Sequence, residues 1–442
     1  MRKSTSIDTK KRYKFPDFKI IEFKNLYLVI SPETANWIVL DNDEQLSFFE
    51  LLDDYSIEES LQNYSGELKN AQWVLTQLEA RQFENTVVIS PADEIGKTIH
   101  LYITNSCNLR CPHCYMFSGI KNDNELTEEE IMDVLSQFRK LNGENVTFSG
   151  GEIMMRSDFC SIVKKSKELG FKVRLLTNGT LWTKEMVEEI SQYTDSVQIS
   201  IDGYSEETNA KVRGKDAFEK SLDTLDWFTQ KNCEVEIGIT PWYTEKLSEE
   251  TSCYTDFAKT IIDKYKGKVK INFAEEVVDG RDVKLANAEK DEYYSIINKI
   301  RSDFYKFDTA DMSFIKAYKD NAITNNCMFG SLSVSSTGDV YCCARITSLA
   351  SIGNVRESKL QDLVKIAQKA HELSNINNFK PCNQCDLKYI CGGGCRIDSF
   401  PDFANCDINT VDITQIKPRS CDSSLKNYFY EIMVRTNTKF FK

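Results

Sequence analysis

The feature that most constrains this chain is a short cysteine-rich loop directly after a strand-like run at residues 100–104. The loop reads Cys107-Asn108-Leu109-Arg110-Cys111-Pro112-His113-Cys114, with three residues between the first two cysteines and two between the next pair. Three thiolates on one tight loop can each bind a different iron of a [4Fe–4S] cube. The fourth iron then has no protein ligand, so the loop predicts an iron–sulfur cluster with one open iron.

A zinc site is the main alternative for this loop. Structural zinc takes four ligands and usually shows paired Cys-x2-Cys units, whereas the loop supplies three thiols. His113 could be a fourth ligand, but it lies inside the loop between two of the cysteines. The pattern therefore favours the iron–sulfur cluster.

The cysteine loop, the aromatic Tyr115 that follows it and the later Gly150-Gly151-Glu152 segment together resemble the radical S-adenosylmethionine (SAM) superfamily. The resemblance implies that the open iron chelates the amino and carboxylate groups of SAM. It also implies that one electron from the reduced cluster cleaves the sulfonium to a 5′-deoxyadenosyl radical. The protein's task in such a system is to place and shield the radical.

Length and composition set the broad class. At 442 residues the chain is too long for one ordinary core, so two or three domains are expected. The sequence is 41% hydrophobic and 28% charged, as in soluble globular proteins. It has no run of eighteen apolar residues, and the first eight residues lack the apolar core of a signal peptide. These features predict a cytoplasmic protein with no membrane association.

The fifteen cysteines fall largely in clusters, in a chain without an export signal. In a reducing compartment such clusters indicate metal ligands rather than disulfides. The formal net charge of -12 argues against bulk electrostatic binding of nucleic acid. We therefore expect no nucleic-acid partner.

Residues 1–95 are predicted to form a separate module without cysteine. Runs at 19–23 and 27–30 suggest a hairpin, a third strand follows at 37–40, and three short helical patterns occupy the rest. The order resembles the winged-helix-like, α+β PqqD-like domains that recognise peptides in many ribosomal-peptide maturases. The resemblance implies a leader-binding domain that pairs an extended peptide with a strand edge. A structural cap and, against the acidic charge, a DNA-binding winged helix are the alternatives.

Residues 96–280 alternate strands with amphipathic helices, and Thr127 and Glu130 form a capping box at the start of one of them. The predicted strands are 100–104, 145–149, 172–177, 196–201, 234–239 and 268–273. Such a chain is of the α/β class with a parallel sheet. It matches the partial (β/α)6 radical SAM barrel, whose site lies at the carboxyl ends of the strands, as in complete barrels.

Residues at those strand ends are candidates for binding SAM. Glycines allow close backbone approach, and a carboxylate can accept a hydrogen bond from an ammonium group. The resemblance therefore implies that the glycine segment holds the methionine amino end of SAM, that a Ser contacts its ribose or carboxylate and that an Arg faces its carboxylate. The candidate cofactor-binding residues are Tyr115, Gly150, Gly151, Glu152, Asn178, Ser200 and Arg213. No catalytic acid or base can be identified from the sequence.

Residues 281–325 have a helical pattern and are predicted to bridge to a second cysteine-rich region at 326–442. The spacing in that region closely resembles the SPASM extension, which carries two auxiliary [4Fe–4S] clusters. The resemblance implies that the outer cluster is held by Cys382, Cys385, Cys391 and Cys421, and the inner one by Cys327, Cys343 and Cys395. With the loop cluster this makes three [4Fe–4S] clusters. The glycines at 392–394 would let the loop wrap round the sulfides.

Three questions about these ligands stay open in the sequence. Some relatives have a further cysteine at the position of Ser333, so the inner cluster either recruits Cys342 or keeps an open iron. Cys406 is an alternative to Cys421. Two zinc ribbons are the alternative to both clusters.

The predicted function is a radical SAM maturase of a ribosomally made peptide. The enzyme would abstract hydrogen from a precursor whose leader is bound by the N-terminal domain and would form an intramolecular crosslink, a thioether in preference to a carbon–carbon bond. A flavodoxin or ferredoxin-type protein would supply electrons. The alternatives are oxidation of a protein side chain, as in anaerobic sulfatase maturation, and a non-catalytic zinc-binding adaptor.

Overall fold

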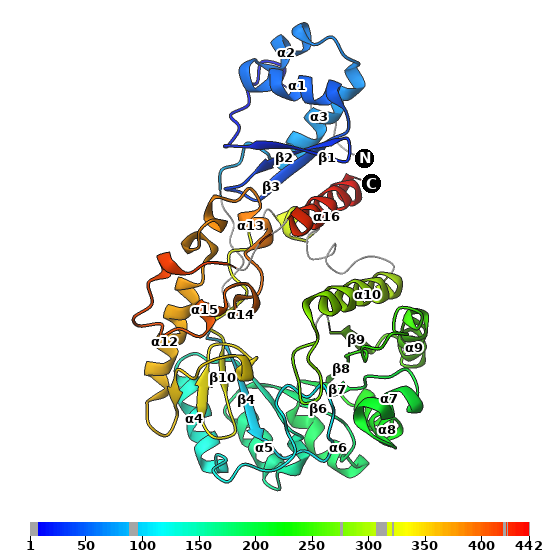
Figure 1. The fold of residues 1–442 in the computed structure, drawn as a ribbon, viewed down its shortest axis with the longest axis vertical. Coiled ribbons are helices and arrows are strands. Elements are labelled where there is room, and N and C mark those ends of the chain that lie inside the picture. The colour runs from blue at the N-terminus through cyan, green and yellow to red at the C-terminus, as the bar shows by residue number, and fades with distance from the viewer. Residues whose placement is uncertain are drawn as a thin grey trace.

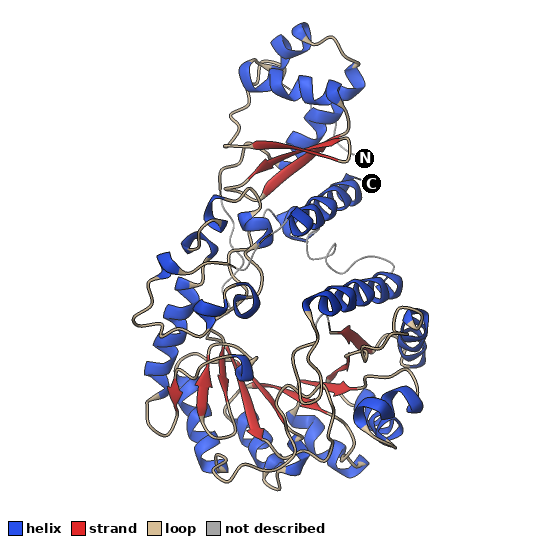
Figure 2. Cartoon of the chain, viewed as in Figure 1, coloured by secondary structure: helices blue, strands red, loops and turns tan. Residues whose placement is uncertain are grey.

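The computed structural model describes residues 8–87, 96–274, 277–305, 316–320, 322–418, 421 and 423–441. The chain forms an N-terminal domain, a large sheet covered by helices, and a C-terminal region that lies between them (Figures 1 and 2). In the part of the chain that is described, no helix is both long enough and apolar enough to span a membrane.

The N-terminal domain has the three strands and three helices that the sequence predicts. An antiparallel sheet in the order β1-β2-β3 is followed by helices that cover one of its faces. Asn42 caps the first helix, and Ser56 and Glu59 form a capping box on the second. The elements are β1 (Lys19–Phe23), β2 (Leu26–Ser31), β3 (Asn36–Leu40), α1 (Asp43–Asp54), α2 (Ile57–Asn63) and α3 (Leu68–Arg81).

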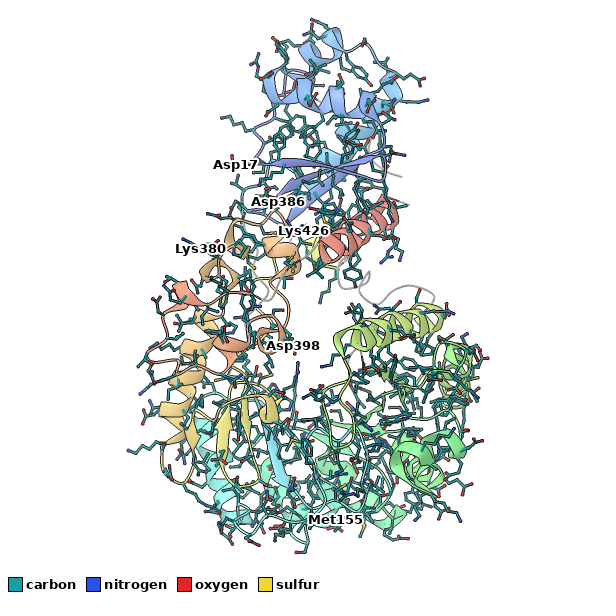
Figure 3. All side chains as sticks on the ribbon, viewed as in Figure 1. Asp17, Met155, Lys380, Asp386, Asp398 and Lys426 are labelled. Carbon is teal, nitrogen blue, oxygen red and sulfur yellow. The ribbon has the colours of Figure 1, made fainter. Side chains whose placement is uncertain are left out.

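The other face of this small sheet packs on the C-terminal region. Trp37 of β3 lies 4.2 Å, between ring centroids, from Tyr318, and its indole N–H donates to the carbonyl of Met433 in α16 (Ser423–Phe441). The guanidinium of the buried Arg81 stacks on the Tyr318 ring. Lys19 forms an ion pair of 2.5 Å with Asp386, which Figure 3 labels at this junction. The N-terminal domain is therefore docked firmly on the C-terminal region.

The large sheet contains the six parallel strands that the sequence predicts, each paired with the next in chain order. Their side chains alternate between buried and more exposed, as in β6, because one face of each strand packs more closely against apolar neighbours. The strands are β4 (Thr98–Thr104), β5 (Asn145–Gly150), β6 (Lys172–Thr177), β7 (Ser196–Ser200), β8 (Glu234–Ile239) and β9 (Val269–Phe273).

Helices connect these strands and cover the outside of the sheet (Figure 1). The predicted capping box of Thr127 and Glu130 is present at the start of the first of them. They are α4 (Glu128–Lys140), α5 (Phe159–Glu168), α6 (Lys184–Ile190), α7 (Glu206–Arg213), α8 (Ala217–Thr229) and α9 (Thr251–Lys264). A further helix, α10 (Asn287–Tyr305), follows the last of the six strands and packs against α9.

The sheet is larger than the sequence predicts, because three short strands from the second cysteine region extend it. β10 (Leu332–Val334) pairs in parallel with β4, and β11 (Asp339–Tyr341) and β12 (Gly353–Asn354) follow it antiparallel. Strands of two or three residues carry too little periodicity to be recognised in a sequence. Their pairing places the second cysteine region beside the strand that precedes the cysteine loop.

The C-terminal region is otherwise built from short helices and loops. Arg356 joins it to α4 through two hydrogen bonds to Glu130, which hold the pKa of that carboxyl down at about 2. Its helices are α12 (Leu360–Leu373), α13 (Lys388–Cys391), α14 (Arg396–Ser399) and α15 (Pro401–Ala404). The chain closes with α16, whose Tyr428 hydroxyl lies 3.1 Å from that of Tyr294 in α10.

Candidate functional site

The cysteine loop begins at the carboxyl end of β4, where the pairing with β5 is irregular between Tyr102 and Thr104. Its three thiols are half-buried and line one cavity of about 380 Å³ at the carboxyl ends of the parallel strands. We call this the strand-end cavity. The structure thus brings Cys107, Cys111 and Cys114 together where the sequence places the site.

A segment after β9 holds the loop in place. The backbone N–H groups of Arg281 and Asp282 donate to the carbonyls of Cys114 and Pro112, and the Arg281 guanidinium donates to the carbonyls of Cys111 and Ser118. No sequence pattern indicated this role, because residues 281–325 were predicted only to bridge two regions. An arginine that satisfies loop carbonyls has no sequence pattern of its own.

Gly150 and Gly151 line the strand-end cavity, as predicted. A Cβ at Gly150 would lie 2.3 Å from the carbonyl oxygen of Thr104, and one at Gly151 would lie 2.1 Å from that of Ser106. These glycines therefore permit the close approach of β5 to the start of the cysteine loop. The glycines thus have a structural role within the protein, in addition to any contact that they make with a ligand of the cavity.

Glu152 lies elsewhere than the sequence suggested. It is fully buried and is not among the residues that line the cavity. One carboxylate oxygen accepts from the Thr177 hydroxyl at 2.6 Å and the other from the backbone N–H of Asn178 at 2.7 Å. Burial raises the pKa of this carboxyl. Its observed contacts tie the ends of β5 and β6 together instead of facing a ligand.

Asn178, Ser200 and Tyr115 all line the cavity. The amide nitrogen of Asn178 donates to Asn108 at 3.0 Å and lies 4.0 Å from the sulfur of Cys107. Ser200 is at the end of β7. The hydroxyl of Tyr115 lies 3.2 Å from that of Tyr102 in β4. All three predicted residues are therefore placed where a ligand of the cavity could contact them.

Arg213 lines the cavity too, but the sequence missed the acid that orients it. Its Nε lies 2.7 Å from a carboxylate oxygen of Asp202, which is 1% exposed. The same oxygen lies 3.3 Å from Nε2 of His113. Burial lowers the pKa of this histidine, and the nearby Arg213 opposes the raising effect of Asp202. Asp202 thus fixes one edge of the guanidinium and leaves its terminal nitrogens for another partner.

The chemistry of this cavity suits an iron–sulfur cluster. Burial raises the pKa of Cys107 to about 11 and also raises that of Cys111, while the cation of Arg213 acts in the opposite direction on Cys111. Because clusters bind thiolates, assembly would release protons and place negative sulfur beside Arg213. Cys107, Cys111 and Cys114 would hold such a cluster.

The second cysteine region forms two groups of thiols. In the outer group, Cys382 and Cys391 each interact electrostatically with Cys385 and Cys421. Burial is the main cause that raises the pKa of Cys391 to about 11. This is the set proposed for the outer cluster. Cys421 interacts electrostatically with Cys382 and Cys391, whereas Cys406 interacts with Cys342.

The inner group lies around Cys343 and Arg345. Burial is the main cause that raises the pKa of Cys343, and this thiol interacts electrostatically with Cys327 and Arg345. A terminal nitrogen of Arg345 lies 3.6 Å from the sulfur of Cys395. Cys342 is buried and lines a separate smaller cavity together with Cys406. Arg345 therefore interacts with two of the thiols assigned to the inner cluster, and Cys327 interacts with one of these two, Cys343.

Gly392, Gly393 and Gly394 have φ values of +63°, +78° and +67°, a conformation that favours glycine. The buried side chain of Arg396 donates to the carbonyls of Gly392 and Gly394, at 3.0 and 2.6 Å. This arginine also interacts electrostatically with thiols of both groups. The sequence predicted the glycines but not the buried arginine that holds their carbonyls.

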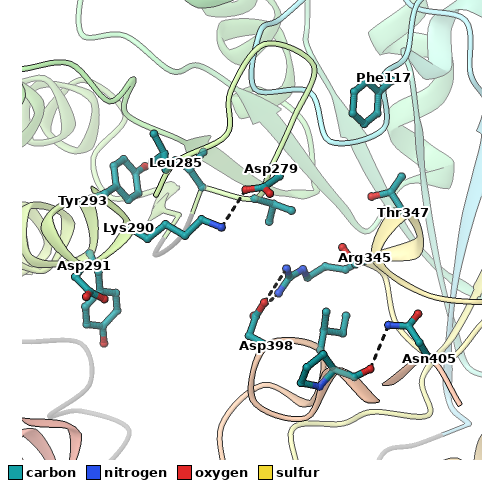
Figure 4. Close-up of a pocket in the computed structure, with 16 residues that line it drawn as sticks. Phe117, Asp279, Leu285, Lys290, Asp291, Tyr293, Arg345, Thr347, Asp398 and Asn405 are labelled. Atoms are coloured by element: carbon teal, nitrogen blue, oxygen red, sulfur yellow. Dashed lines mark hydrogen bonds and ion pairs between the residues drawn. The ribbon is translucent and has the colours of Figure 1, made fainter. Parts of the chain in front are cut away.

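A larger cavity of about 650 Å³ adjoins the strand-end cavity, because Val277 and Val278 line both. Figure 4 shows two ion pairs in it, Lys290 with Asp279 at 3.0 Å and Arg345 with Asp398 at 2.5 Å. It is bounded by α10, the cysteine loop and the second cysteine region. This large cavity connects the two halves of the candidate site, and α10, which showed no chemistry in the sequence, forms part of its wall.

The described residues contain no group of three or more His, Cys, Asp or Glu side chains that could hold a single metal ion. Ligands of a cubane cluster bind different irons and lie farther apart than ligands of one ion. The thiol groups described above therefore suit iron–sulfur clusters better than a single metal ion.

Comparison with known families agrees with this geometry. The sequence model of the radical SAM superfamily matches residues 101–252. Residues 101–252 are therefore similar to a radical SAM domain. The model of the SPASM iron–sulfur cluster-binding domain matches residues 326–386. The two domains imply SAM and iron–sulfur clusters as cofactors.

Relatives with curated names fall into two groups. The chain is 26% identical to the AdoMet-dependent heme synthase of Methanosarcina barkeri, over 67% of this chain and 90% of that protein. It is 26% identical to the mycofactocin maturase MftC of Mycolicibacterium smegmatis, over 67% and 77%. It is 34% identical to the sporulation killing factor maturation protein SkfB of Bacillus subtilis, over 34% and 37%.

Solved structures support the fold. The chain is similar to anSMEcpe with bound AdoMet, at 17% identity and a TM-score of 0.58, over 78% of this chain and 94% of that one. At this identity the likeness concerns the α/β fold of the radical SAM domain with its mostly parallel sheet.

We expect Arg213→Lys to weaken SAM binding by about tenfold, because a lysine ammonium cannot hold Asp202 and a ligand carboxylate together as a guanidinium does. Titration calorimetry of anaerobically reconstituted protein checks this. Lys211→Ala, which removes a cation from an exposed position of α7, is the matched control and should bind SAM normally. Equal affinity in the wild type and in Arg213→Lys would contradict the assignment.

We expect Gly393→Ala to reduce both stability and iron content more than Gly394→Ala. Both positions have positive φ, which costs an alanine about 1–2 kcal/mol. At Gly393 the new Cβ would also lie 2.3 Å from Ile376, whereas at Gly394 the nearest atom, an oxygen of Ser399, lies at 3.0 Å. Thermal unfolding and iron per chain after reconstitution measure the difference. Equal losses in the two variants would show that the packing at Gly393 is unimportant.

Proposed function

We propose that this chain is a radical SAM maturase of a ribosomally synthesised peptide. It would cleave SAM reductively, abstract a hydrogen atom from the peptide and form an intramolecular crosslink. The cofactors would be SAM and three [4Fe–4S] clusters, one in the cysteine loop and two in the second cysteine region. The cluster and SAM together supply the 5′-deoxyadenosyl radical.

The observation that carries this proposal is that the two cavities adjoin and share Val277 and Val278 in their linings. The strand-end cavity holds the three loop thiols and Arg213, and the large cavity extends from it to Arg345 beside the inner thiols. A peptide side chain in the large cavity would be within reach of both. The chain's own residues would shield the radical and orient the substrate there, Phe117 and Tyr293 by apolar contact and the two ion pairs by hydrogen bonding.

The N-terminal domain supports a peptide as substrate. Its hairpin turn, Lys24-Asn25, has two residues with positive φ, as in a two-residue type I′ turn. In such a hairpin, alternate pairs are hydrogen-bonded, so Ile20 and Glu22 of β1 direct their backbone groups away from β2. Within the described part of the chain no backbone hydrogen bond outside the hairpin uses them. This edge could accept an extended leader.

The opposite edge of the same sheet is already engaged. Gln77 of α3 both accepts from the N–H of Val39 and donates to its carbonyl, and the Tyr318 hydroxyl donates to the carbonyl of Trp37. A strand could add at β3 only by displacing these groups. The proposal therefore assigns leader recognition to β1.

The maturases MftC and SkfB among the relatives also support a peptide, while the heme synthases among them are the reason to test the substrate directly. The domain with the open β1 edge favours the peptide, because a porphyrin needs no strand edge. A flavodoxin or ferredoxin-type donor would reduce the clusters.

A thioether is the favoured crosslink. Ser333, at the position where some relatives have a further cysteine, lies buried in β10, and Cys342 lines a different cavity from Arg345. These placements support an inner cluster with three thiol ligands and an open iron that could bind a substrate thiolate.

Anaerobic incubation of the reconstituted enzyme with SAM, a reductant and the peptide encoded beside its gene tests the function. We expect the peptide to lose two hydrogens by mass spectrometry, with formation of 5′-deoxyadenosine, and we expect Cys107→Ala to do neither. An unchanged peptide mass with active SAM cleavage would reject this substrate. Oxidation of one Cys or Ser side chain without a crosslink would favour the protein-oxidase alternative.

The β1 edge is tested by Glu22→Pro, which removes one outward N–H without removing a hydrogen bond inside the hairpin. We expect the dissociation constant of a labelled leader peptide to rise about tenfold, because a main-chain hydrogen bond is lost and the ring obstructs the edge. Glu22→Ala, at the same exposed position, is the control and should bind normally. Fluorescence anisotropy measures both, and equal affinities would exclude β1 as the docking edge.

A further inference from the structure

Two tyrosines lie between the cysteine loop and the second cysteine region. Tyr115 follows Cys114 directly and lines the strand-end cavity, while Tyr102 comes from β4 and is 3% exposed. Their hydroxyl oxygens are 3.2 Å apart. The Tyr102 hydroxyl also donates to the carbonyl of Ala344, at 2.5 Å.

Ala344 is the residue after Cys343, so the pair connects two ligand loops. A chain of covalent and hydrogen bonds runs from Cys114 through Tyr115 and Tyr102 to Ala344 and Cys343. Tyr115 interacts electrostatically with both of these cysteines, and Tyr102 interacts with Cys343. The parallel pairing of β10 with β4 fixes this arrangement, because it sets the second cysteine region beside Tyr102.

We propose that Tyr115 and Tyr102 form the electron path between the cluster of the cysteine loop and the inner auxiliary cluster. The inference rests on the proposed cluster sites. It adds electron transfer to the role of Tyr115 as a candidate SAM contact, and it gives Tyr102 a role of its own. Electrons transfer faster through covalent and hydrogen bonds than through space over the same distance. Removal of either hydroxyl interrupts the path.

The step moves one electron and no proton. When the crosslink closes, the peptide would lose one electron to the inner site, which would change from the 2+ to the 1+ state. The thiol proton would already have left to solvent when the substrate sulfur bound as a thiolate. That electron then passes along the tyrosines to the loop site, which changes from 2+ to 1+ as the inner site returns to 2+. The phenols stay protonated and are not oxidised themselves.

The return of the electron has a consequence for turnover. SAM cleavage consumes one electron at the loop site, and the oxidative closure of the crosslink releases one. With the path intact, the released electron can prepare the loop site for the next SAM. With the path broken, each cycle needs an electron from the external donor.

The test uses the full-length protein, reconstituted anaerobically, without SAM or peptide. A light flash with a deazaflavin photoreductant adds less than one electron per chain, and freeze-quench EPR follows its redistribution among the clusters. In Tyr102→Phe and in Tyr115→Phe we expect the fast redistribution phase to be lost, while the final distribution stays the same. The double variant should be no slower than either single one, since both interrupt one path.

Tyr265→Phe is the matched control, because it also loses a side-chain hydrogen bond, to Asp226, far from the cysteines. It should redistribute electrons as the wild type does. An unchanged fast phase in both Tyr102→Phe and Tyr115→Phe overturns the proposal. So does a changed final distribution at an unchanged rate, because it shows that the hydroxyls set cluster potentials rather than a path.

Iron and sulfide contents accompany each measurement. If Tyr102→Phe loses a cluster, the result for Tyr115→Phe tests the proposal, because the Tyr115 hydroxyl makes no hydrogen bond to the loop of Cys343. The measurement needs no peptide, so a failure of the proposed substrate leaves its result intact, and a failure of this path leaves the peptide assay intact.

Discussion

The parallel pairing of β10 with β4 is the contact on which the candidate site depends. Three residue pairs, Leu332 with Ile99, Ser333 with His100 and Val334 with Leu101, join segments more than two hundred residues apart in the chain. They place the second cysteine region beside β4 of the large sheet. Without that register, the inner thiols would have no fixed relation to the cysteine loop, and the two cavities would not share a wall.

Buried and partly buried arginines hold much of what surrounds this site. Arg281 satisfies carbonyls of the cysteine loop, Arg396 those of the glycine loop, and Arg213 is oriented by Asp202. Arg81 stacks on the Tyr318 ring where the N-terminal domain meets the rest of the chain. A buried guanidinium is costly unless its donors are satisfied, so each arginine fixes several backbone or acidic groups at once. These contacts hold the irregular loops in defined conformations.

The arrangement also relates the N-terminal domain to the cysteine region. Lys19 at the start of β1 pairs with Asp386, which follows Cys385, and Lys388 pairs with Glu33 beyond β2. The domain that we propose to bind the leader thus rests on the segment that carries the outer thiols. An extended peptide leaving β1 would begin its path next to the C-terminal region, on the way to the large cavity.

The sequence by itself determined the cysteine loop, the six alternating strands and helices, the capping box at Thr127 and the glycine positions, because each depends on local spacing or periodicity. It also predicted that Gly150, Asn178 and Ser200 lie at one edge of the sheet, since parallel strands end at a common edge. Only the tertiary structure decided that Glu152 faces inward, that Asp202 orients Arg213 and that α10 lines the large cavity. These depend on contacts between distant segments, and short strands such as β10 leave too little pattern in the sequence to reveal them.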